Sequence, residues 1–360
     1  MTTLSEKAHH RLNDEALIRE RDLWVSRMEA VYHGTPDSYN EKYVYMLWGK
    51  EPRPSDPLLA YRDPEEWVRQ SLELMAELEV TGENRFLPWC FEYHVFGVHF
   101  IDRIFDADVF HLEDPNTFYE QLWNARYLKT PVGTLKMPDL EHNETWSMAK
   151  RAANAFLEAD VRLPFYGTPV LSSPLNIFLN LYGEEALVAL MEEPEAAEHD
   201  LGIITEVIRT LHRWHREHIP EAQLQGCITN MRTAPPGYGQ ICGCSTQLLS
   251  GPLYAKVIAP LDDAILGEYP HGGMIHLCGT HTQHIPTFRG MKHLASVQLN
   301  DAAADELEAY VRGLREDQVI YLNPSEKMPI PEAVRVSGGK RIILCIPENA
   351  PAQPGRAENG

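Results

Sequence analysis

Short apolar segments of strand length alternate with longer amphipathic segments along most of the chain. Residues 64–80 have apolar positions three and four apart and open with Pro64 and two glutamates, which is typical of a helix start. Further helices are predicted over 147–160, 183–219, 251–268 and 302–315. Strands are predicted over 85–91, 163–171, 223–231, 238–245, 272–279, 294–301, 318–324 and 340–347. Strands separated by helices indicate parallel β-α-β units, and about eight strands are the number that closes a barrel.

The two ends of the chain lack this alternation. Residues 1–35 are polar and amphipathic, which predicts helix, and residues 36–63 combine glycine and proline with aromatic residues, which predicts an irregular cap. Residues 348–360 are rich in proline and alanine and are predicted to be disordered. We therefore expect a helical extension over 1–63, a barrel over 64–347 and a disordered tail.

Composition supports a globular protein and narrows its partners. The chain has 360 residues, of which 44% are hydrophobic and 23% charged, and its net charge is −20. So acidic a chain is a poor ligand for nucleic acid or an anionic membrane, because both are bound through lysine and arginine. No apolar stretch is long enough for a membrane span, and the N-terminus is too polar for a signal peptide. We expect a cytoplasmic protein with a small-molecule substrate and six cysteines that form no disulfides.

The sharpest candidate for chemistry is a histidine and a cysteine in one predicted strand. His276 and Cys278 are separated by one residue, so their side chains share a face. Imidazole and thiolate together favour zinc, and three protein ligands leave a fourth position for a substrate. Cys345, near the end of the last predicted strand, could meet them at the carboxyl edge of the barrel. His281 or His284 could replace Cys345, and a buried cysteine is often only a small hydrophobic residue.

A second group of candidates precedes that strand. Cys242 and Cys244 share a strand face, but no second cysteine pair accompanies them, so a close-packed strand end is the simpler interpretation. Arg232 could bind an anionic substrate or lie at the surface. We take Cys244, Tyr238 and Arg232 as candidate substrate-binding residues. No catalytic residue is singled out, because the chain has neither a nucleophile elbow nor a phosphate loop.

Three stretches, in this order, resemble the uroporphyrinogen decarboxylase superfamily. They are LPFYGTPVLSSPLNIFLNLYGEEALVALMEEPEAAEHDL, STQLLSGPLYAKVIAPLDDAI and MIHLCG. The resemblance covers roughly residues 85–346 and implies a (β/α)8 barrel. The superfamily includes zinc-dependent methyltransferases that move a methyl group from a corrinoid protein to a thiol such as coenzyme M. The chain resembles that branch more than the decarboxylases, because it lacks their R-Q-A-G-R-Y signature and its region YVYMLWGKEPRP stands in that place.

This resemblance implies a zinc-dependent methyltransferase. It implies Zn²⁺ held by His276, Cys278 and Cys345, methylcobalamin supplied by a corrinoid protein, and a thiol or folate as methyl acceptor. One alternative is a metal-free decarboxylase of a pyrrolic or aromatic acid, in which Arg232 would hold a carboxyl group. Another is a non-catalytic barrel that binds a tetrapyrrole or a metal. The oligomeric state stays open.

Overall fold

The largest sheet among the described residues has six parallel strands, five from the C-terminal half of the chain and one from residues 44–48. In this computed structural model the described residues are 3–34, 44–48, 53–79, 86–93, 95–112, 123–170, 172–225 and 232–347. The strand order is β1–β11–β10–β9–β8–β7, and each neighbouring pair is parallel. The strands are β1 (Val44–Trp48), β7 (Gly239–Cys242), β8 (Gly273–Cys278), β9 (Leu294–Asn300), β10 (Val319–Leu322) and β11 (Ile342–Pro347). Their near-continuous apolar sequences fit a parallel sheet that is covered on both faces.

A smaller parallel sheet continues the arrangement. Its three strands, in the order β2–β5–β6, are β2 (Cys90–Glu92), β5 (Phe165–Gly167) and β6 (Leu224–Gln225). An antiparallel pair, β3 (Asp108–His111) and β4 (Trp123–Arg126), lies outside both sheets. Single parallel bridges, Met46 with Phe86 and Ser172 with Cys242, link the two larger sheets. The described strands therefore form an α/β fold with two parallel sheets, and regular pairing does not run unbroken around a closed barrel.

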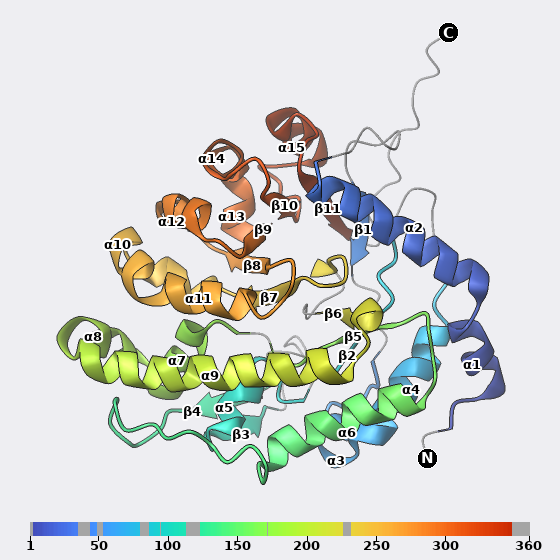
Figure 1. Cartoon of the computed structure of the whole chain (residues 1–360), viewed down its shortest axis with the longest axis horizontal. Coiled ribbons are helices and arrows are strands. Elements are labelled where there is room, and N and C mark those ends of the chain that lie inside the picture. The colour runs from blue at the N-terminus through green and yellow to red at the C-terminus, as the bar shows by residue number, and fades with distance from the viewer. Residues whose placement is uncertain are drawn as a thin grey trace.

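Helices surround these strands (Figure 1). In the N-terminal half they are α1 (Glu6–Leu12), α2 (Glu15–Tyr32), α3 (Leu59–Arg62), α4 (Pro64–Ala76), α5 (Phe100–Ile104), α6 (Glu144–Glu158), α7 (Pro174–Tyr182), α8 (Glu184–Glu192) and α9 (Pro194–His218). They continue with α10 (Gly251–Leu253), α11 (Ala259–Leu266), α12 (Ile285–Gly290), α13 (Asp301–Asp305), α14 (Leu307–Gly313) and α15 (Ile330–Ser337). A π-helical turn, Tyr254–Ile258, joins α10 to α11. None of the described helices is long and apolar enough to cross a membrane.

Most differences from the sequence-based elements have a local cause. The helix predicted over 1–35 is split into α1 and α2, because Asp14 caps a new helix by accepting from the backbone N–H groups of Ala16 and Leu17. The helix predicted over 183–219 is split before Pro194, which disfavours helical backbone in the residue that precedes it.

The segment predicted as an irregular cap, 36–63, contains strand β1 and helix α3 among its described residues. Strand β1 forms through its pairing with β11, which a local pattern does not reveal. The division into an extension and a barrel at residue 63 stays a prediction. The predicted tail, 348–360, lies outside the described residues.

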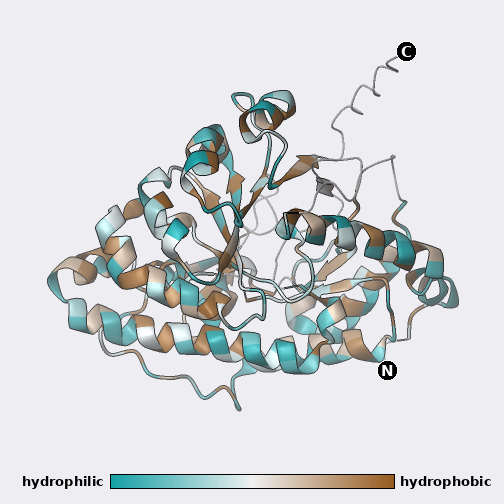
Figure 2. Cartoon of the chain, turned by 45° about the horizontal axis from the view of Figure 1, so that its top comes forward, coloured by the Kyte–Doolittle hydropathy of each residue, from teal (hydrophilic) through white to brown (hydrophobic). Residues whose placement is uncertain are grey.

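Two apolar clusters make up the core. The larger one fills the space between the strands and the surrounding helices, and in Figure 2 the brown, apolar positions lie on the strands and on the inward sides of the helices. The smaller cluster gathers side chains from α2 and from strands of both sheets, including Met28, Met46, Cys90 and Cys345. At its edge the Tyr32 hydroxyl donates to Ser296 Oγ over 3.0 Å. Helix α2 therefore contributes side chains to the core.

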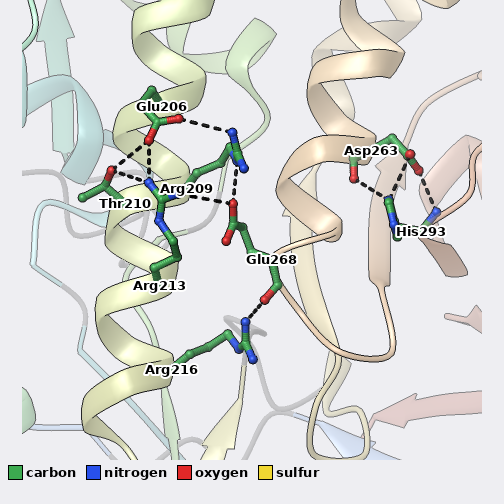
Figure 3. A network of polar contacts seen from close by, with 8 residues as sticks. All are labelled: Glu206, Arg209, Thr210, Arg213, Arg216, Asp263, Glu268 and His293. Atoms are coloured by element: carbon green, nitrogen blue, oxygen red, sulfur yellow. Dashed lines mark hydrogen bonds and ion pairs between the residues drawn. The ribbon is translucent and has the colours of Figure 1, made fainter.

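A polar network ties α9 to the connection between α11 and β8 (Figure 3). Arg209 Nε donates to Glu268 Oε1 over 2.6 Å, and Arg216 donates to the Glu268 backbone carbonyl. On the far side of α11, Asp263 Oδ1 accepts from the backbone N–H of His293 over 2.7 Å. These contacts fix the segment that leads into β8, the strand that carries His276, and the residue that precedes β9.

Two buried histidines on α9 give the fold a predicted sensitivity to acid. Burial lowers the pKa of His212 to about 3 and that of His215 to about 4. The unfolded chain binds these protons at about pH 6.5, so stability is complete above that pH and falls as the pH drops towards 4. Each histidine should remove up to about 1.4 kcal/mol per pH unit within that range.

Urea unfolding at pH 7.5 and 5.5 measures this effect. His215→Phe keeps a ring against Trp146 and removes one titrating group, so it should narrow the difference in unfolding free energy between the two pH values. His142→Phe, at an exposed position, serves as the control. An unchanged pH dependence of stability in His215→Phe would contradict the lowered pKa of His215.

Candidate metal centre

Two neighbouring strands end in the same place with chemically similar residues. Strand β7 ends at Cys242 and β8 at Cys278, and each cysteine is followed by a glycine. In the parallel register Cys242 lies opposite His276, and the Gly243 N–H donates to the His276 carbonyl over 2.9 Å. The carboxyl ends of parallel strands are where functional residues gather in α/β folds.

The side chains at these strand ends form a cluster of ligand atoms. One ligand atom from each of Cys242, Cys244 and His276 lies within 4.8 Å of the other two. The Sγ atoms of Cys242 and Cys244 are 3.4 Å apart, and those of Cys244 and Cys278 are 2.7 Å apart. All three cysteines are free thiols. In the part of the chain that the structure describes, no other group of histidine, cysteine or carboxylate residues has this spacing.

Two of the three cysteines in the cluster have a pKa that is shifted towards the thiolate form. Hydrogen bonding with Cys244 lowers the pKa of Cys242 to about 6 against the effect of burial, and the Arg232 guanidinium lowers it further. Hydrogen bonding with Cys244 also lowers the pKa of Cys278. The pKa of Cys244 itself is raised, because its thiol is hydrogen-bonded to the sulfur atoms of both neighbours and is largely buried. Thiolate is the form of cysteine that binds metal.

A chain of amides orients the His276 ring. His276 Nδ1 is hydrogen-bonded to Gln298 Oε1, and Gln298 Nε2 donates to Asn323 Oδ1 over 2.7 Å. Since an amide oxygen accepts, Nδ1 carries the proton and Nε2 keeps its lone pair. Burial holds the pKa of His276 well below its usual range, so the ring is neutral. A neutral histidine fixed through its second nitrogen is the usual form of a metal ligand.

Two buried polar side chains accompany the cluster without hydrogen-bond partners. Arg232 is only 7% exposed, and its Nε and Nη1 atoms have no partner among the described residues. Arg232 therefore does not lie at the surface, which was one of the two possibilities that the sequence left open. Gln240, two residues before Cys242 on β7, is 2% exposed, and neither of its amide atoms has a partner within the described ranges. Such groups are costly to bury alone, so they mark a place where a polar ligand fits.

The structure does not bring Cys345 into the ligand cluster. Strands β9 and β10 separate its strand, β11, from β8. The Cys345 side chain is fully buried in the smaller apolar cluster with Met46 and Cys90, and burial raises the pKa of its thiol. Of the three predicted ligands, His276 belongs to the group whose ligand atoms are close enough to share a metal ion. Cys278 does not belong to that group but contacts one of its members, Cys244.

The remaining candidates are divided between the cluster and other places. Cys244, predicted to bind substrate, is the central sulfur of the cluster. Tyr238 lies at the opposite, amino end of β7, where its ring packs on Tyr32 with centroids 4.4 Å apart. His281 and His284, the alternative ligands, are bonded to Thr246 instead.

Sequence reasoning missed Cys242 as a candidate metal ligand and did not single out Gln298 and Asn323, the amides that orient His276. One signal was available, because Ile-Cys-Gly at 241–243 and Leu-Cys-Gly at 277–279 end consecutive strands in the same way. No comparable pattern marks the two amides, which act through neighbouring strands.

Comparison with known proteins bears on the fold. Neither a protein-family model nor a curated protein sequence matches this chain. Its structure is similar to that of a methyltransferase from Methanosarcina mazei, with a TM-score of 0.58 and 12% sequence identity. The similarity covers 90% of this chain and 92% of that one. At this identity the likeness concerns the fold alone. The chain thus shares its α/β fold, over nearly its whole length, with a methyltransferase.

Proposed function

We propose that this protein is a zinc-dependent methyltransferase that moves a methyl group from a corrinoid protein to a thiol or folate acceptor. The observation that carries the proposal is the cluster of Cys242, Cys244, Cys278 and His276 at the carboxyl ends of β7 and β8. The shared fold with a methyltransferase supports it as an analogy.

The residues present fit zinc better than other common metals. Thiolates and a neutral imidazole are the ligands zinc prefers, whereas magnesium and calcium need oxygen ligands. Cys242, Cys244 and His276 would hold the ion, and Cys278 is the next sulfur within reach. Zinc bound there would act as a Lewis acid that lowers the pKa of an acceptor thiol.

The surrounding residues have roles of their own in this proposal. Gln298 and Asn323 keep His276 in the tautomer that offers Nε2. Arg232, a buried cation with unpartnered N–H groups, would hold an acidic group of the acceptor. With the acceptor sulfur as thiolate, a sulfur–carbon bond to the methyl group forms while the cobalt–carbon bond breaks. The electron pair of that bond stays on cobalt, and the thiol proton passes to solvent.

We also infer that the two parallel sheets are parts of one eight-stranded barrel. The bridges from Met46 to Phe86 and from Ser172 to Cys242 support this, because they lie at the two junctions where the sheets meet. Eight of the nine described strands in the two sheets, β1, β2, β5, β7, β8, β9, β10 and β11, would form the barrel, and the two-residue strand β6 would add to it only through its pairing with β5. The cysteine cluster would then lie at the carboxyl rim, where barrel enzymes carry their active sites.

A metal and turnover assay tests the proposed function. Purified protein should bind one zinc ion, and with free methylcobalamin in place of the corrinoid protein it should methylate 2-mercaptoethanesulfonate and 3-mercaptopropionate. Removal of zinc by a chelator should abolish this turnover. Ethanethiol, which has no acidic group, should react more slowly in wild type, and Arg232→Met should remove that difference.

Two results would count against the proposal. One is protein that binds no zinc, and the other is methyl transfer that persists at the same rate without zinc. Release of carbon dioxide from a pyrrolic acid, independent of zinc, would favour the decarboxylase instead.

A further inference from the structure

The contact between Cys244 and Cys278 depends on the turn that follows β7 as well as on strand pairing, because only Cys278 lies within a strand. Cys244 lies beyond the end of β7, at the start of a 3-10 turn over Cys244–Leu248. Cys278 is the last residue of β8, and the chain turns after it at Gly279. Sheet register alone therefore does not fix the 2.7 Å separation of their sulfur atoms. Something must hold the two turns together.

Thr246 is the point where these turns are joined. Its hydroxyl donates to the Gly243 carbonyl over 2.8 Å, within its own turn. The same oxygen lies 3.1 Å from His281 Nδ1, and the Thr246 carbonyl lies 2.8 Å from His284 Nε2. All three side chains are buried, with exposed fractions of 1%, 0% and 0%. Both histidines follow β8, so each bond crosses from one turn to the other.

The hydrogen-bond pattern fixes the form of both rings. The Thr246 hydroxyl donates its only proton to the Gly243 carbonyl. It must therefore accept from His281, which is protonated at Nδ1. A carbonyl can only accept, so His284 is protonated at Nε2.

Close packing of the backbone supports the same junction. Gly279 has φ +96°, and a Cβ atom there would collide with the Gln247 side chain from the other turn. The His284 ring is backed by Tyr254, with ring centroids 4.5 Å apart. On the side of His284 the junction is therefore packed as well as hydrogen-bonded, whereas at Gly279 the neighbour is the end of the exposed Gln247 side chain.

We propose that Thr246, His281 and His284 are positioning residues of the metal centre, which hold the turn that bears Cys244 against the turn that follows Cys278 at the end of β8. The inference rests on the proposed function in so far as these sulfur atoms belong to a metal centre. It gives the two histidines a role other than that of ligands, because neither ring belongs to the described group that has metal spacing. One nitrogen of each ring bonds Thr246, and the other, His281 Nε2 or His284 Nδ1, has no partner among the described residues.

Zinc affinity, measured by chelator competition, tests the inference. His281→Ala and His284→Ala should each weaken zinc binding by about 10–100-fold, as is usual for residues that orient metal ligands. His281→Asn places an amide N–H near Nδ1, and His284→Gln places one near Nε2, so both should recover most of the affinity. Thr246→Val, which keeps the shape and removes the hydroxyl, should behave like His281→Ala. His142→Ala, at an exposed histidine bonded to Asp139, should leave the affinity unchanged.

A spectroscopic measurement separates positioning from a general loss of stability. In cobalt-substituted protein, the sulfur-to-metal charge-transfer band reports how many thiolates bind. This band should weaken in His281→Ala and return in His281→Asn, while the melting temperature of the metal-free proteins reports folding separately.

The outcomes distinguish this inference from the proposed function. Wild type that binds no zinc overturns the metal centre itself. Wild type that binds zinc, together with alanine variants of unchanged affinity and spectrum, overturns the positioning role alone. Failure of both amide variants to recover affinity would make the histidines ligands and would also overturn it.

Discussion

Replacing Cys244 with serine is expected to weaken zinc binding by roughly 100-fold or more. Its sulfur is the only one of the three that contacts both others, at 3.4 Å from Cys242 and 2.7 Å from Cys278. The apparent binding free energy of zinc in thiolate sites is about 10–16 kcal/mol and is shared among about four ligands, so each ligand is worth several kcal/mol. Serine keeps the size of the side chain and removes the soft donor. Chelator competition measures the change.

Cys345→Ala is the matched control, because Cys345 is the third ligand that the sequence predicts. The structure places it in an apolar cluster, so alanine should leave the zinc affinity unchanged. It should lower the free energy of unfolding by about 1 kcal/mol, through the small cavity that it leaves. The reverse result, zinc lost from Cys345→Ala and kept by Cys244→Ser, would refute the cluster described here and restore the sequence-based ligand set.

Asp200→Ala is expected to lower the free energy of unfolding by about 3 kcal/mol or more. Asp200 is a fully buried carboxylate on α9. It accepts from the backbone N–H groups of Gly133 at 2.8 Å and Leu135 at 3.1 Å, and from the Tyr182 hydroxyl at 2.7 Å. Alanine would leave these donors buried without an acceptor, and each orphaned donor costs about 1–3 kcal/mol. The segment before α6 would lose its attachment to α9.

Urea unfolding with Asp139→Ala as control tests this prediction. Asp139 lies in the same segment as Gly133, but it is exposed and bonds mainly to His142. Its replacement should not change stability measurably. A loss of less than about 1 kcal/mol in Asp200→Ala would show that the segment is held by other contacts. Zinc affinity should not change in either variant, because both positions lie away from the cysteine cluster.

Helix and strand positions were largely readable from the sequence, because apolar spacing reports local geometry. Pro64 with two glutamates begins α4, as predicted. The run around His276 is a strand, and so is the run around Cys345. Breaks such as the one before Pro194 were missed, although proline chemistry marks them. Strand β1 was missed for a different reason, since it forms by pairing with a strand at the other end of the chain.

The candidate site likewise has features that the local sequence fixes and features that depend on long-range contacts. A separation of two residues in a strand fixes that His276 and Cys278 share a face, whatever the rest of the fold does. The amino-acid types fix that such a site, if it binds metal, suits zinc. The sequence by itself therefore determined the α/β class and the identity of one half of the candidate centre.

Only the tertiary structure decided which other cysteines lie beside His276 and Cys278. Strand order puts β7 directly beside β8 and places two strands between β8 and β11. Cys242 and Cys244 consequently meet His276, while Cys345 packs among apolar side chains. Local periodicity carries no information on which strands are neighbours, because that choice depends on long-range packing of helices between the strands. This neighbour relation places the cysteine pair at the end of β7 in a candidate metal centre.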